Sequence, residues 1–178
     1  MGIERSRRTV SSRRIQTLVM GLLDASSLCA IATRTRRGGA YVNTAYFARS
    51  PEFDLFWLSD PQAEHSRNLR ANPTVAVAVY DSTQSWGESD RGIQLFGSAR
   101  LLNGSEAQGP ERSYAARFPE YRPGELSAYR VYRFRPRRMK LFDEAALGGG
   151  VFVTASVRSG RVAWERTEIS RPEAGARR

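Results

Sequence analysis

The stretch FWLSDPQAEHSRNLRANPTVAVAVYD, residues 56–81, contains the signals that decide the fold. The apolar run over 55–59 is typical of a buried strand, and residues 60–72 are predicted to form a short helix that ends before Pro73. Valines alternate with smaller residues over 74–80, which predicts a second strand with one apolar face. Ala76 and Ala78 on its other face leave room for another element to pack closely.

The junction between the first strand and the helix is a candidate anion site. We expect Ser59 or Asp60 to cap the helix. The first N–H groups of a helix lack intrahelical partners and its N-terminus carries positive partial charge, so anions bind there. His65, the only histidine, lies three residues before Asn68, so both could donate to a bound phosphate. The alternative is that Ser59 only caps the helix and His65 is a solvated helix residue.

The segments around this stretch predict a small antiparallel barrel with helices at its connections. Apolar residues recur at helical spacing over 13–25, with Ser12 as a possible N-cap, whereas the period changes to two over 28–33 and 40–48. The fold class is therefore α+β, mainly β. The remaining predicted elements are a strand over 93–102, a helix over 105–118, a strand over 128–143 interrupted at Pro136, and a last hairpin that turns at Ser159–Gly160.

Length and composition are those of one globular domain. The chain has 178 residues and a net charge of +10. Only one of its 28 basic residues is a lysine, and the arginines are spread along the chain, so a nucleic-acid partner is not expected. The basic segments 1–11 and 169–178 are expected to be disordered tails around a domain over 12–168. No apolar run reaches the ~20 residues that span a membrane, so no membrane partner and a cytoplasmic location are expected.

Several classes of site have no support in the sequence. No GxGxxG, GxxxxGK[ST] or GxSxG motif is present. With one histidine and one cysteine, Cys29, the chain does not predict a zinc site or an internal disulfide, and Cys29 is expected to be an inert core thiol. No catalytic acid, base or nucleophile is identified.

The ordered set FWLSDPQAEHSRNLRANPTVAVAVYD…RGIQLFGSARLL resembles the pyridoxamine 5'-phosphate oxidase-like family, the FMN-binding split β-barrels. The shared pattern is an aromatic strand ending in Thr or Ser, a short helix, NL..NP, an alternating apolar strand and then..G.A. The resemblance covers residues 12 to 143. It implies an antiparallel split β-barrel with flanking helices, a flavin-dependent oxidoreductase acting on a small molecule, and a homodimer with FMN at the subunit interface.

The resemblance also implies which residues bind the cofactor. One strand would lie along the flavin, the end of the next strand would contact the ribityl-phosphate, and His65 would replace the lysine that binds the phosphate, with Asn68 beside it. The implied cofactor-binding residues are Asn43, Thr44, Ala45, Tyr46, Leu58, Ser59, His65, Asn68 and Arg91.

The chain departs from the family pattern at three positions. Glu64 replaces an arginine beside the would-be phosphate, and Gly92 replaces a glutamine. Glu168 stands where the oxidase has a substrate-binding arginine after a tryptophan, and an acidic group there argues against pyridoxamine phosphate as the substrate. The alternatives are an F420-dependent reductase, or a flavin- or haem-binding protein without turnover, in which His65 could be the axial ligand.

Overall fold

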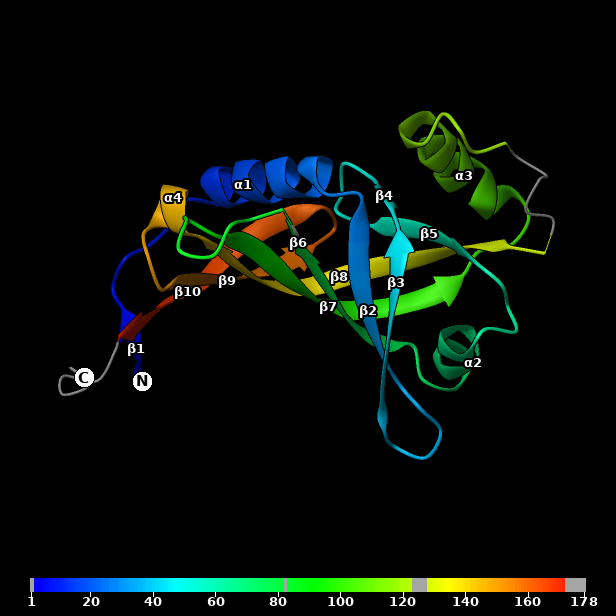
Figure 1. The fold of residues 1–178 in the computed structure, drawn as a ribbon, viewed down its shortest axis with the longest axis horizontal. Coiled ribbons are helices and arrows are strands. Elements are labelled where there is room, and N and C mark those ends of the chain that lie inside the picture. Colours follow the sequence, from blue (N-terminus) through cyan, green and yellow to red (C-terminus); the bar gives the residue numbers. More distant parts are fainter. Residues whose placement is uncertain (1, 82, 123–127, 172–178) are drawn as a thin grey trace.

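Figure 1 shows the computed structural model, which describes residues 2–81, 83–122 and 128–171. Antiparallel strands form one curved sheet, and helices lie against its sides and ends. The elements, in chain order, are β1 (Gly2–Ser6), α1 (Ser12–Ala25), β2 (Leu28–Arg34), β3 (Ala40–Tyr46), β4 (Ala48–Arg49), β5 (Leu55–Ser59), α2 (Glu64–Ala71), β6 (Thr74–Tyr80), β7 (Arg91–Leu101), α3 (Ser105–Arg117), β8 (Arg130–Asp143), α4 (Glu144–Leu147), β9 (Val151–Arg158) and β10 (Arg161–Arg171).

The sheet does not close on itself. Its hydrogen-bonded order is β1-β10-β9-β8-β7-β6-β2-β3, and β5 pairs with β8 and β4. Strands β3 and β5 are in contact, yet no ladder joins them in the described residues. This opening between β3 and β5 is what makes the barrel split, so the predicted α+β split barrel with flanking helices is confirmed.

Helix α1 covers the sheet with the apolar stripe that its spacing predicts. Ile15, Val19, Leu22 and Leu23 are all buried in the main core. Ser11, one residue before the expected cap, accepts a hydrogen bond from the Arg14 backbone N–H at 3.3 Å. The cap position differs because the first helical residue is Ser12 itself.

The described parts of both chain ends form strands where disordered tails were expected. Strand β1 pairs with β10 from Gly2 opposite Arg171 to Ser6 opposite Thr167, so the expectation of a disordered tail over 1–11 is wrong for this segment. Charge patterning missed it because a paired edge strand tolerates arginines on its exposed faces. Strand β10 also runs past the expected domain end at 168, and residues 172–178 lie outside the described residues.

Pro136 does not interrupt the long strand that contains it. Strand β8 is continuous, and Pro136 faces Gly97 of β7, where the register shifts between Phe96 and Gly97. A bulge removes the need for a ladder hydrogen bond from the missing proline N–H, which is why the strand continues.

The thiol of Cys29 is expected to be unreactive in the folded protein. It is 2% exposed, lies 3.6 Å from the Ala45 carbonyl oxygen, and burial raises its pKa to about 12. A thiol reagent at pH 8 should therefore modify Cys29 only after denaturation, because the thiolate is the reactive form. Labelling with 5,5'-dithiobis-2-nitrobenzoate in buffer and in guanidinium checks this, and stoichiometric labelling of the native chain would contradict it.

Candidate functional site

The junction between β5 and α2 differs from the predicted one in a way that leaves a helix end open. Helix α2 begins at Glu64, and a turn separates it from β5, closed by a hydrogen bond of 3.0 Å from the Ala63 N–H to the Asp60 carbonyl oxygen. The N-cap is Ala63, which has no side chain that can accept a hydrogen bond. The expectation that Ser59 or Asp60 caps the helix is therefore wrong. The first-turn N–H groups of α2 have no side-chain cap among the described residues.

Ser59 and His65 lie together beside this uncapped end. The Ser59 hydroxyl is 2.6 Å from His65 Nε2 and 3.4 Å from the Ser66 hydroxyl. Ser59 is 6% exposed and Ser66 is fully buried. The sequence predicted Ser59 as a helix cap and His65 as a helix residue, and the structure brings their side chains into direct contact. The corner thus gathers two hydroxyls and an imidazole within hydrogen-bonding reach.

The imidazole of His65 is held in its neutral form. Burial lowers its pKa from the usual 6.5 because the charged form loses hydration. A neutral imidazole can exchange a hydrogen bond with the Ser59 hydroxyl, as the 2.6 Å distance requires. At neutral pH, His65 therefore contributes a hydrogen bond rather than a positive charge.

The lowered pKa predicts that stability falls in mild acid. Below about pH 6.5 the unfolded chain takes up a proton at His65 that the folded chain does not, so the free energy of unfolding decreases as pH falls. At neutral pH both states are unprotonated and this loss is absent. We expect the difference in unfolding free energy between pH 7.5 and pH 5.5 to be smaller in His65→Gln, measured by urea denaturation. Equal differences in the two proteins would contradict the prediction.

Asn68 positions α2 rather than facing the same space as His65. Its side-chain amide donates to the Thr33 hydroxyl on β2 at 3.1 Å, and both residues are buried. The predicted pairing of Asn68 with His65 as two phosphate donors is not seen in this arrangement. Asn68 instead fixes the helix against the sheet.

The four predicted residues of β3 divide between its two faces. Asn43 and Ala45 pair with Ile31 and Cys29 on the core side, whereas Thr44 and Tyr46 are exposed on the other side. The Asn43 side-chain carbonyl oxygen is buried without a hydrogen-bond partner in the described residues. Burying a hydrogen-bond acceptor without a donor destabilises the folded state, so the Asn43 Oδ1 atom can accept a hydrogen bond from a ligand.

The two remaining predicted residues do not join the corner within one chain. The Leu58 side chain lies on the opposite side of β5 from Ser59 and lines a cavity of about 330 Å³ next to α3. Arg91 begins β7, beside Asp81 at 3.9 Å. Arg91 thus lies at the turn end of the β6–β7 hairpin, where Tyr80 pairs with Gly92. Helix α2 precedes the other end of β6, so Arg91 and the start of α2 are at opposite ends of this hairpin.

Glu168 does not act as an isolated negative charge. Burial works against its ionisation, but Arg166 at 3.0 Å and Lys140 at 3.5 Å hold its pKa below the usual range. The sequence pattern marks Glu168 as a departure from the oxidase. Sequence alone did not show that two cations from β8 and β10 neutralise it.

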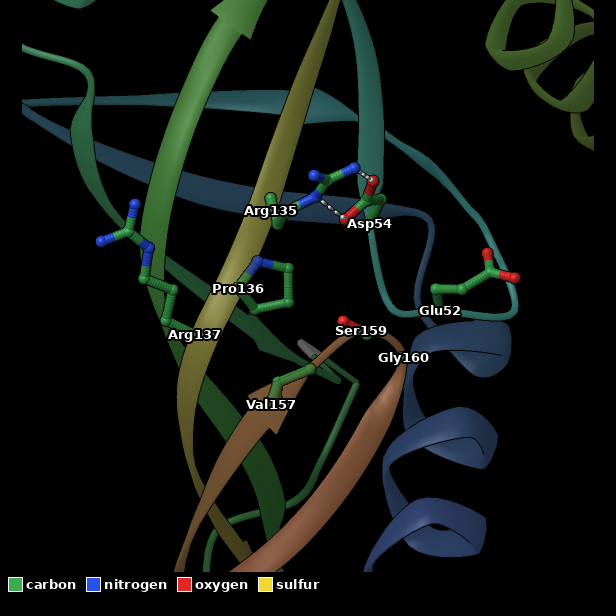
Figure 2. A pocket seen from close by; sticks show the side chains of 8 residues that line it. All are labelled: Glu52, Asp54, Arg135, Pro136, Arg137, Val157, Ser159 and Gly160. Atoms are coloured by element: carbon green, nitrogen blue, oxygen red, sulfur yellow. Dashed lines mark hydrogen bonds and ion pairs between the residues drawn. The ribbon is translucent and has the colours of Figure 1, made fainter.

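A cavity of about 530 Å³ lies elsewhere, between the β4–β5 turn and the β9–β10 hairpin (Figure 2). Asp54 accepts hydrogen bonds from Arg135 at 3.4 and 3.3 Å on its wall, so these charges largely satisfy each other. None of the predicted site residues lines it.

Neither a metal cluster nor a membrane helix marks the described part of the chain. No group of three or more His, Cys, Asp or Glu side chains there could hold a metal ion. None of its helices is long and apolar enough to cross a bilayer.

A barrel split between β3 and β5, with helices at its connections, defines the class of split β-barrels, and comparison with known families agrees. The family model described as pyridoxamine 5'-phosphate oxidase matches residues 16–143. The chain belongs to the pyridoxamine 5'-phosphate oxidase family. No curated protein sequence matches the chain.

Solved structures with the same fold have low sequence identity to the chain. A haem-binding protein from Mycobacterium smegmatis has a TM-score of 0.69 and 17% identity, over 86% of this chain and 61% of that one. HutZ, a haem storage protein from Vibrio cholerae, has a TM-score of 0.61 and 21% identity, over 70% and 91%. Campylobacter jejuni ChuZ has a TM-score of 0.69 and 12% identity, over 88% and 63%. The chain thus spans less than two thirds of the length of the first and third of these.

Proposed function

We propose that the chain is a flavoprotein that binds FMN at the corner of β3, β5 and α2 and uses it for redox chemistry on a small molecule. The observation that carries this proposal is the uncapped start of α2 beside the Ser59 hydroxyl and His65 Nε2, which lie 2.6 Å apart. This end of the helix supplies backbone N–H donors and positive partial charge to a phosphate.

The donor set fits a phosphate through neutral groups. The Ser59 and Ser66 hydroxyls and neutral His65 can donate hydrogen bonds. Glu64, the acidic departure from the family pattern, is ion-paired with Arg67 at 2.5 Å. We infer that Glu64 does not prevent anion binding at this site, because its ion pair with Arg67 offsets its negative charge.

The edge of β3 fits the flavin ring. As the last strand of the main sheet order, β3 has one edge whose backbone N–H and C=O groups pair with no other strand in the described residues. Those groups, with the unpaired Asn43 carbonyl oxygen, can bind the ring's polar edge. Bound FMN would supply hydride transfer, and the chain would supply binding and orientation. F420 presents a phosphate to the same corner and is the alternative redox cofactor.

The exposed face of β2, β3 and β6 supports a homodimer. Small residues, Ala30, Ala32, Ala76 and Ala78, line up across β2 and β6. The large apolar side chains Leu28, Val42, Tyr46 and Tyr80 around them are 45–62% exposed. An apolar face of this kind on one chain is typical of an interface. We infer that a second copy covers it and brings its Arg91 toward the cofactor.

Replacing a small residue of this face should separate the copies. Ala78→Arg places a long charged side chain on this face, beside Ala30 of β2, and a second copy cannot bury an unpaired charge there without large cost. Sedimentation velocity should show a dimer for the unchanged chain and a monomer for Ala78→Arg. Exposed Ser113→Arg on α3 is the matched control and should stay dimeric. A monomeric unchanged chain would contradict the inference.

Haem is a second candidate because His65 is neutral and the chain shares its fold with haem proteins. A neutral imidazole is the form that ligates iron. The fold neighbours include a haem-binding and a haem storage protein. The corner favours FMN because the uncapped start of α2 is suited to a phosphate.

Absorption and fluorescence titrations with FMN, F420 and haem distinguish these cofactors. FMN should bind at one site per chain with a changed flavin spectrum and altered fluorescence. Saturable F420 binding without FMN binding would assign the deazaflavin, and a Soret band lost in His65→Ala would assign haem. Absence of binding by all three would overturn the proposal.

A further inference from the structure

A basic hollow on the other side of α2 is separate from the Ser59–His65 contact. It has a volume of about 520 Å³ and is lined by the β2–β3 turn and by one face of α2. The turn projects past α2 in Figure 1, so the two elements flank the same space. This volume is within the range of ~300–1,000 Å³ typical of small-molecule sites.

The charges of the hollow are unbalanced. Four arginines, Arg36, Arg37, Arg67 and Arg70, line it together with one acid, Glu64. Glu64 is already paired with Arg67. The sequence between residues 33 and 51 contains no acidic residue, so the turn brings none of its own. Arg36, Arg37 and Arg70 thus have no carboxylate partner in the described part of the chain, and one N–H group of Arg70 donates to the Pro61 carbonyl oxygen at 2.6 Å.

The frame that holds these arginines is well defined. The turn is closed by hydrogen bonds from the Thr35 N–H to the Gly39 carbonyl at 2.8 Å and from the Gly38 N–H to the Thr35 carbonyl at 2.9 Å. On the opposite wall, buried Asn68 holds α2 to Thr33. A fixed frame reduces the entropy that ligand binding must overcome.

We propose that this hollow binds a small ligand with several phosphate or carboxylate groups, independently of the flavin phosphate. Guanidinium groups bind such oxyanions with paired hydrogen bonds. One phosphate would leave two or more of the arginines unused, whereas a ligand with several anionic groups can engage Arg36, Arg37 and Arg70 together. The hollow is enclosed by two short elements, which suits a small ligand better than the long backbone of a nucleic acid.

Isothermal titration calorimetry of the full chain at physiological salt tests the proposal, with tripolyphosphate, citrate and orthophosphate as probes. Tripolyphosphate or citrate should bind at least about tenfold more tightly than orthophosphate, because each additional charged hydrogen-bonding pair contributes at least that factor. The tighter of the two assigns phosphate or carboxylate as the preferred group. If neither binds more tightly than orthophosphate, the proposal is wrong.

The double variant Arg36→Gln/Arg37→Gln should weaken that binding by about tenfold or more. Arg112→Gln/Arg161→Gln removes the same net charge from exposed positions outside the hollow and is the matched control. We expect it to leave the affinity within about twofold, because distant surface charges are screened. Equal losses in both variants would show that only net charge matters and would overturn the proposal. Circular dichroism confirms that both variants fold.

FMN titration of the same proteins separates this inference from the proposed function. FMN affinity should be unchanged in Arg36→Gln/Arg37→Gln. If tripolyphosphate displaces FMN and this variant loses both ligands, the hollow belongs to the flavin site and the separate site is wrong. If FMN never binds but tripolyphosphate behaves as expected, the flavin proposal fails and this one stands. Tighter binding of single-stranded RNA to the same arginines would overturn the small-ligand proposal.

Discussion

Gly97→Ala should destabilise the chain more than any other single methyl addition at its glycines. A Cβ on Gly97 would lie 2.0 Å from the Arg135 carbonyl oxygen and 2.9 Å from the Arg135 carbonyl carbon and the Pro136 Cα. All three contacts are with the backbone of β8, so no side-chain rotation relieves them. We expect a loss of about 3–5 kcal/mol in the free energy of unfolding, through overpacking and the shift of two paired strands.

Urea denaturation followed by tryptophan fluorescence measures this loss. Gly21→Ala is the matched control, because a Cβ there meets nothing within 4 Å and the residue lies in helix α1. That change should stabilise the chain by about 0.5–1 kcal/mol through higher helix propensity. A Gly97→Ala protein as stable as the unchanged chain would show that β7 and β8 are not packed as described.

On the proposed function, removing either member of the Ser59–His65 contact should weaken FMN binding by about tenfold to a hundredfold, since each is proposed to donate a hydrogen bond to the FMN phosphate. Ser59→Ala and His65→Ala should not be additive. The two side chains are 2.6 Å apart and in contact, so removing one of them already displaces the other, and the second substitution then costs less affinity.

Fluorescence titration of FMN against both single variants and the double variant checks this prediction. Ser113→Ala, at an exposed serine on α3, is the control and should bind FMN like the unchanged chain. Thermal melts of all four proteins separate lost binding from lost folding. Additive losses would contradict the coupling of the two groups, and the absence of any loss would place the phosphate elsewhere.

Most of the fold could be predicted from local sequence patterns, because the residues of each helix or strand determine most of its secondary structure. The stripe of Ile15, Val19, Leu22 and Leu23 and the alternation over 74–80 are periodic signals that burial confirms. Strand β1 was not accessible, because its pairing depends on β10, over 150 residues away in sequence. Such pairing leaves no local trace in the short segment over residues 2–6.

The site was accessible only in part, for a similar reason. Ser59 and His65 were identified as candidates, but their contact depends on where α2 begins. The N-cap is Ala63, which has no capping side chain, and not Ser59 or Asp60 as predicted. Sequence could not show that the Asn68 side-chain amide donates a hydrogen bond to the Thr33 hydroxyl. The neutralisation of Glu168 by Lys140 and Arg166 depends on strand register between β8, β9 and β10.

The measurement that tests the central claim most directly is the NMR spectrum of the imidazole of His65 during an FMN titration. His65 is the only histidine in the chain, so its ring nitrogen and carbon-bound proton signals need no assignment. We predict that these signals shift and saturate at one FMN per chain, in step with the change in flavin fluorescence. If the fluorescence titration shows that FMN binds while the imidazole signals do not shift, the cofactor does not occupy the β5–α2 corner, and the account of this site is wrong.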